Sequence, residues 1–202
     1  MRFITSSAIL AGMAQVVLGQ DQGGVSLSTA LSNYTELSTF GTILNAFPQL
    51  LTQLVPQDQN LRVTILIPSN DAFKKFVNET GTEATSLPVE QLLPVLKYHI
   101  LAAKMTSRNF TNGDKKGVVV PTLLREKLYN NRSAGQALIN TFGAQAAEGN
   151  VLYISPDPIA KAKLKVRQSN PSANVRGGLG ATSVVRAVDG EFMGGNFQII
   201  DT

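Results

Sequence analysis

Cations alternate with apolar residues along one short segment of this sequence. The cations are Lys161, Lys163, Lys165 and Arg167, and Ala162, Leu164 and Val166 separate them. In a β-strand successive side chains point to opposite faces, so the four cations would share one face. Same-face neighbours lie about 6.6 Å apart, within the Debye length of about 8 Å at physiological salt, and repel one another unless negative charge lies opposite. This basic stripe predicts a site for an anionic glycan. The alternative is an edge strand whose cations prevent aggregation.

The net charge is unevenly distributed along the chain. Residues 1–100 carry 5 Lys plus Arg against 7 Asp plus Glu, whereas residues 101–202 carry 13 against 7, so the two parts sum to −2 and +6 and give the total of +4. A locally basic C-terminal half suits an anionic polysaccharide or an acidic membrane surface. Nucleic acid is excluded as a partner by the predicted secretion described below.

Catalytic chemistry has little support in the sequence. The chain contains one histidine, His99, and no cysteine, which excludes thiol catalysis, disulfides and cysteine-ligated metals. No Gly-x-Ser-x-Gly elbow, phosphate-binding glycine loop or His-Glu-x-x-His pattern occurs. We therefore predict that the protein is not an enzyme and uses neither a metal nor a cofactor.

The N-terminus has the pattern of a secretory signal peptide. Arg2 precedes a mostly apolar run that ends at the small residue Gly19, so residues 1–19 are predicted to be a signal peptide rather than a membrane helix. No later stretch is apolar enough for an integral membrane segment. Four Asn-x-Ser/Thr sequons agree with secretion and predict surface glycosylation at Asn33, Asn78, Asn109 and Asn131.

A buried strand followed by a capped helix is the strongest local signal. Residues 63–67 form an unbroken apolar and β-branched run, which predicts a strand buried on both faces. Pro68 ends the run, Ser69 is a good N-cap, and Asp71 favours the positive end of a helix.

Three motifs, in order, resemble those of the fasciclin domain, a secreted adhesion module. The first is the apolar strand at 63–67 followed by Pro-Ser, two polar residues and Ala-Phe at 68–73. The second is Leu-Lys-Tyr-His-Ile-Leu at 96–101, and the third is Gly-Asn-Phe-Gln-Ile-Ile-Asp at 195–201. The resemblance covers residues 25–202, which we expect to form one domain. The sequence departs from the family pattern at Gln198, where the family more often has His. It also ends in mid-strand by that pattern, so we expect the domain to be truncated at its C-terminus. The missing disulfides and the sequons resemble fungal members of the family.

The order of predicted elements indicates an α+β fold. Apolar residues at helical spacing predict helices between residues 27 and 55, with a gap at Gly41, and a further helix that begins near Gln91 so that Pro94 lies in its first turn. Residues 104–116 and 168–181 are predicted loops. Later β-favouring runs lie at 118–124, 136–142, 151–155, 159–167, 182–188 and 197–201. The resemblance implies that these strands form a compact β-sandwich with the helices packed against one side and end.

The resemblance also implies candidate adhesion residues. Tyr98 and His99 match the central Tyr-His motif, although apolar neighbours favour a role in folding, with at least one ring buried and hydrogen-bonded to backbone. Asp189 matches the acidic residue of an Asp-Ile integrin motif, but Gly190 stands where that motif has Ile. The alternative is an Asp-Gly hairpin turn.

Together these observations predict a secreted, non-enzymatic module of cell adhesion in the extracellular matrix or cell wall. The resemblance implies the adhesive role, and the predicted partners are extracellular or cell-wall polysaccharides and cell-surface proteins. Two alternatives remain: a domain that binds a small apolar ligand or lipid, and a structural spacer of a tandem-domain protein.

Overall fold

The computed structural model describes residues 24–54, 62–111, 117–129, 134–156, 173–177 and 182–201. The structural statements below concern these ranges. The predicted signal peptide, the sequon at Asn131 and the basic stripe (Lys161, Lys163, Lys165 and Arg167) lie outside them.

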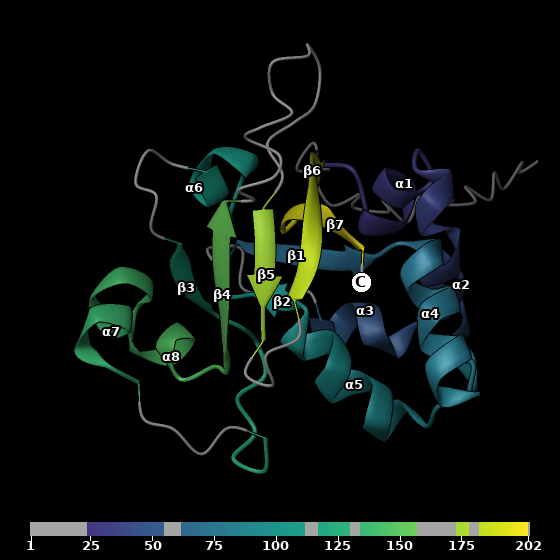
Figure 1. Cartoon of the computed structure of the whole chain (residues 1–202), viewed down its shortest axis with the longest axis horizontal. Helices are drawn as coiled ribbons and strands as arrows, with labels where there is room; N and C mark the ends of the chain where they lie inside the picture. The colour runs from purple at the N-terminus through teal and green to yellow at the C-terminus, as the bar shows by residue number, and fades with distance from the viewer. Residues whose placement is uncertain are drawn as a thin grey trace, which may run out of the picture.

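Seven strands form one mixed sheet in the order β2-β1-β7-β6-β5-β4-β3. The strands are β1 (Val63–Pro68), β2 (Ile100–Leu101), β3 (Val118–Pro121), β4 (Val151–Pro156), β5 (Ala173–Arg176), β6 (Thr182–Phe192) and β7 (Gly195–Asp201). Neighbouring strands are antiparallel except for β1 and β7, which are parallel. A bridge between Leu101 and Thr122 joins the two ends of the sheet. The sheet is therefore nearly closed as a barrel, with β4 and β5 in front of β1 in Figure 1.

Short helices pack alongside this sheet. They are α1 (Leu27–Leu31), α2 (Ser38–Ala46), α3 (Gln49–Leu54), α4 (Asn70–Thr80), α5 (Val89–Tyr98), α6 (Ser107–Thr111), α7 (Gln136–Phe142) and α8 (Ala144–Ala147), with 3-10 turns η1 (Thr35–Leu37) and η2 (Ala84–Ser86). Figure 1 shows α1, α2 and α4 together on one side, α3 and α5 below, and α7 and α8 on the opposite side.

The two faces of the sheet bury two separate cores. The outer core lies between the sheet and the N-terminal helices, where Phe197 and Ile199 join Phe40 and Ile43. The inner core fills the barrel and includes Ile200 with residues of the opposite strands. Because side chains alternate along a strand, the neighbours Ile199 and Ile200 belong to different cores.

The predicted strand and capped helix are both present. Residues 63–67 are all buried, which confirms a strand enclosed on both faces. Ser69 Oγ accepts a hydrogen bond from Ala72 N at 3.2 Å, as an N-cap does. Gly81, with φ +69°, ends α4 in the left-handed conformation.

The α+β class with helices packed against the sheet is confirmed. The strands expected to form a compact β-sandwich belong to one continuous sheet, whose curvature brings its two halves face to face around the inner core.

Two predictions of local structure are wrong because tertiary contacts decide them. Residues 136–142 form helix α7 instead of a strand, and the partly buried Leu138 and Phe142 lie one turn apart on it. Residues 173–176, within a predicted loop, form β5 because β4 and β6 pair with it on both sides. Its polar sequence gave little strand signal.

Helix boundaries also differ from those predicted. The first helical break falls at residues 32–34, and Gly41 lies inside α2. Helix α5 begins at Val89, so Pro94 lies beyond the first turn and removes one interior hydrogen bond. Residues 107–111, also a predicted loop, form α6.

Candidate functional site

A buried polar network occupies one end of the barrel. Thr64 of β1 and Asn196 of β7 are register partners and both are buried. Thr64 Oγ1 accepts a hydrogen bond from Met105 N at 2.6 Å, and Asn196 Nδ2 donates to Met105 O at 2.7 Å. These bonds attach the segment after β2 to the central strands, as is expected of polar groups placed in a core.

Asp189 extends this network to helix α6. Its carboxylate accepts hydrogen bonds from Ser107 N at 2.8 Å, from Ser107 Oγ at 2.6 Å and from Gln198 Nε2 at 2.6 Å. Burial by itself would raise the pKa of Asp189, but the hydrogen bonds from Ser107 and Gln198, with the nearby charge of Arg108, hold that pKa below its ordinary value of 3.8. The carboxylate therefore stabilises the end of the barrel.

Gln198 supports the backbone next to Asp189. Its Oε1 accepts hydrogen bonds from Val188 N at 2.9 Å and Asp189 N at 3.1 Å. Asp189 has φ +47° and lies in a bulge where the register of β6 and β7 shifts. The predicted Asp-Gly hairpin is wrong, because the turn between these strands falls at Met193 and Gly194.

Gly190 has a packing role that explains its place after Asp189. A Cβ at this position would lie 2.2 Å from Cζ of Phe197, whose ring is fully buried. An isoleucine, as in the Asp-Ile motif, does not fit here. This chain thus has the acidic residue of the motif at Asp189 but cannot have its aliphatic neighbour at position 190.

Tyr98 and His99 lie at the C-terminal end of α5. His99 Nδ1 lies 2.7 Å from Val95 O and donates to it, the backbone hydrogen bond expected from the sequence. Burial lowers the pKa of His99 below its ordinary value of 6.5, more than the Val95 hydrogen bond raises it. Tyr98 packs against the inner core, and its hydroxyl lies beside Gly177. The Tyr98 side chain thus packs α5 against the sheet, and the backbone of His99 joins it to β1, because His99 O accepts a hydrogen bond from Leu66 N at 2.8 Å.

The described polar groups around Asp189 and His99 form neither a catalytic triad nor a metal site. Ser107 and Asp189 form a pair, but the ring of His99 is engaged with Val95, so these groups do not form a Ser-His-Asp triad. Within the described ranges, no group of three or more His, Asp or Glu side chains lies close enough to hold a metal ion.

Three predicted sequons lie in the described ranges. Asn33, Asn78 and Asn109 are all exposed. Asn109 Oδ1 accepts hydrogen bonds from Thr106 N at 2.7 Å and Thr106 Oγ1 at 2.8 Å, which caps α6. Its Nδ2 atom, the one that a glycan modifies, takes no part in these bonds.

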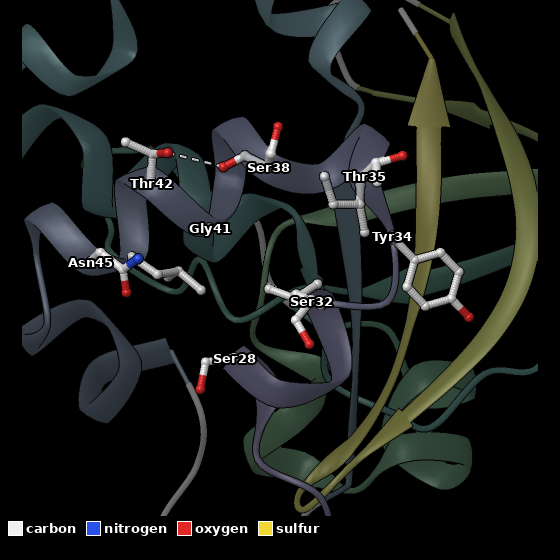
Figure 2. A pocket seen from close by; sticks show the side chains of 11 residues that line it. Ser28, Ser32, Tyr34, Thr35, Ser38, Gly41, Thr42 and Asn45 are labelled. Carbon is white, nitrogen blue, oxygen red and sulfur yellow. Dashed lines mark hydrogen bonds between the residues drawn. The ribbon is translucent and has the colours of Figure 1, made fainter.

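A groove of about 480 Å³ runs between α1 and α2. Hydroxyl and amide groups of Ser28, Ser32, Thr42 and Asn45 line its rim, and no charged side chain occurs among its described lining residues. Figure 2 shows the Tyr34 ring pointing toward the strands, where it contacts Phe197 edge-on at 5.3 Å. Leu31, Leu37 and Leu44 also line it, so the groove has both apolar and polar walls.

Sequence reasoning missed the partners of Asp189. Ser107 lies 82 residues away in the chain, and only the fold brings the two together. Asn196 and Gln198 did carry a signal, because polar residues that alternate with Phe197 and Ile199 in a core strand predict internal hydrogen bonding.

Fold and site define an α+β module whose best-connected polar groups have structural roles. The fasciclin-domain family matches residues 35–153, more than half of the chain. The chain therefore belongs to the fasciclin family, whose domains are generally found in cell adhesion proteins at the cell surface or outside the cell.

One similar solved structure is a FAS1 domain pair from the insect cell adhesion molecule fasciclin I. It is 19% identical, with a TM-score of 0.48, over 81% of this chain and 43% of that one. This chain thus spans less than half of the domain pair. No curated protein sequence matches the chain. None of the helices in the described ranges combines the length and apolar character needed to cross a membrane.

Proposed function

We propose that this chain is a secreted, N-glycosylated adhesion module that acts without catalysis in an extracellular matrix or cell wall. Membership of the fasciclin family carries the proposal. The apolar N-terminal sequence of residues 1–19 and the exposure of Asn33, Asn78 and Asn109 support secretion and glycosylation.

We propose extracellular or cell-wall polysaccharide as the principal partner, with cell-surface proteins as the second class. The basic stripe, Lys161, Lys163, Lys165 and Arg167, supplies four closely spaced cations for an anionic polymer. The C-terminal half, with its excess of cations, supports the same partner.

We propose that Asp189, Tyr98 and His99 affect adhesion through the fold. The Asp189 carboxylate accepts three hydrogen bonds from protein groups, so direct contact with a receptor would require breaking them. Substitution of any of the three would then reduce adhesion only as far as it unfolds the module.

Binding of the secreted full chain to polysaccharides tests this function. Heparin and polygalacturonate serve as acidic probes, and laminarin and chitohexaose as neutral ones, each at low and high salt. A variant with all four stripe cations changed to Ser, checked for folding by circular dichroism, should lose salt-sensitive binding to the acidic probes. Failure of the wild-type chain to bind any polysaccharide would contradict the proposal.

A further inference from the structure

The outer face of the sheet is only partly covered by helices. Over β1 and β7 the outer core buries it against the N-terminal helices. Over β4 and β5 the outward residues Tyr153 and Arg176 are exposed, and Figure 1 shows no helix of the described chain in front of these two strands. This uncovered part faces away from the barrel interior, because Leu152, Ile154 and Val175 point into the inner core.

A cross-strand row of four side chains crosses this uncovered face. The registers pair Val119 with Tyr153, Tyr153 with Arg176, and Arg176 with Thr182. Val119 and Tyr153 are each 41% exposed, so an aliphatic and an aromatic side chain lie side by side at the surface. The row spans three strand spacings, about 14 Å. We call these four residues the Tyr153 row.

Hydrogen bonds fix the two largest side chains of the Tyr153 row. Tyr153 Oη accepts a hydrogen bond from Gly117 N at 3.1 Å, and the ring lies so close over Gly117 that a Cβ there would approach Cζ to 2.5 Å. Arg176 Nε donates to Thr182 Oγ1 at 3.3 Å. An aromatic ring and a guanidinium group held in advance lose little conformational entropy on binding a ligand.

Among the described residues, the charges on this face are close to balanced. Arg176 belongs to the row, and Asp201 lies one row away as the partner of Val184. Arg186, which is also exposed, is paired with Glu36 at 3.2 Å. A balanced face favours an uncharged ligand over a polyanion, because a polyanion requires an excess of cations.

We propose that the Tyr153 row binds a neutral polysaccharide chain laid across the strands. The inference rests on the proposed function and gives it a second site, made of other residues than the basic stripe. The C–H face of a pyranose ring carries slight positive charge and stacks on the negative face of Tyr153. The Arg176 guanidinium and the Asn174 amide, one row away, donate hydrogen bonds to sugar hydroxyls. Val119 extends the apolar contact to a neighbouring sugar.

A neutral sugar polymer suits this face better than a protein partner. Stable protein interfaces use about 20 to 30 residues a side, whereas the Tyr153 row offers four side chains. A linear polysaccharide can bind to a narrow surface such as the Tyr153 row.

Titration of the secreted full chain with laminarin and with chitohexaose tests the inference. We expect binding to at least one of these probes, with little change between low and high salt, since no ion pairs form. Tyr153→Ala should weaken binding about tenfold or more, whereas Tyr153→Phe, which keeps the ring, should stay within about threefold of wild type. Arg176→Gln should weaken binding several-fold.

Two control variants separate this site from other causes. Tyr129→Ala removes a tyrosine that is 49% exposed in the turn at residues 127–129, outside the Tyr153 row, and should bind as wild type does. The stripe variant with four Ser should also retain neutral-glycan binding. Melting temperatures confirm that each variant is folded.

The outcomes distinguish this inference from the proposed function. Binding of acidic probes alone, or equal neutral binding by a folded Tyr153→Ala variant, overturns the Tyr153 row and leaves the proposed function standing. Loss of self-association by Tyr153→Ala in sedimentation, with no effect on sugar binding, also overturns it and makes the face an interface between copies. No binding to any polysaccharide overturns both.

Discussion

Asp189 in β6 accepts two hydrogen bonds from Ser107, the first residue of α6, although 82 residues separate them in the chain. One comes from the Ser107 amide at 2.8 Å and the other from its hydroxyl at 2.6 Å. The pair attaches α6, whose Phe110 enters the inner core, to the bulge between β6 and β7. The residue that family resemblance assigns to adhesion is thus also a structural tie.

Replacement of Asp189 by Ala should destabilise the fold. The change leaves the Ser107 hydroxyl and amide and the Gln198 amide without their acceptor, and we expect a loss of about 2 to 3 kcal/mol in the free energy of unfolding. Urea denaturation measures this loss. Glu191→Ala, two residues along at an exposed ion pair with Lys104, is the control, and its free energy of unfolding should stay close to that of wild type. An Asp189→Ala protein as stable as wild type would show that the hydrogen bonds of Asp189 contribute little to stability.

The same carboxylate should make stability depend on acid pH. The pKa of Asp189 in the folded protein lies below its ordinary value of 3.8, so the unfolded chain takes up the proton first as the pH falls. Its contribution is therefore complete above the unfolded pKa and is lost as the pH falls through the folded pKa. The stability difference between wild type and Asp189→Asn should shrink below about pH 4. A constant difference from neutral to acid pH would contradict this.

His99 should make stability depend on pH in a higher range than Asp189 does. Burial holds the pKa of His99 in the folded protein below 6.5, so between that lowered pKa and 6.5 the unfolded state binds more protons. Stability is then highest above 6.5 and decreases as the pH falls through this window. His99→Gln, which keeps a donor near Val95, should remove the part of the decrease that begins as the pH falls below 6.5. Thermal unfolding at several pH values checks it, and identical pH profiles for the two proteins would exclude a role for His99.

Substitution by Ala at Gly190 and at Gly41 should change the stability of the fold in opposite directions. At Gly190 a Cβ would lie 2.2 Å from the ring of Phe197, which is confined on another side by Tyr34, so we expect a loss of about 1 to 3 kcal/mol. At Gly41, inside α2, a Cβ would meet nothing within 4 Å, so Ala should stabilise by about 0.5 to 1 kcal/mol through helix propensity. Melting temperatures measure both changes, and a shift of the same sign in the two variants would refute the packing argument.

Local signals in the sequence predicted the centre of the fold well. The run at 63–67, the stop at Pro68 and the cap at Ser69 are features of neighbouring residues, and the structure has all three. Segments that depend on distant partners were not predictable in this way. Ala173–Arg176 is a strand because β4 and β6 flank it, and Gln136–Phe142 is a helix despite its β-favouring residues.

The candidate site shows the same difference between local signals and distant contacts. Asp189, Tyr98 and His99 could be named from motifs, but their contacts could not. The bulge that turns Asp189 toward Ser107 requires Gln198 on the next strand to accept two backbone hydrogen bonds. No single stretch of sequence contains that relationship.

Polysaccharide binding by the secreted full chain tests the central claim of an extracellular adhesion module most directly. Titration with acidic and neutral polysaccharides at low and high salt should show salt-sensitive binding that the stripe substitutions at Lys161, Lys163, Lys165 and Arg167 abolish, and salt-insensitive binding that Tyr153→Ala abolishes. A folded wild-type chain that binds none of the polysaccharides at either salt concentration would contradict the claim.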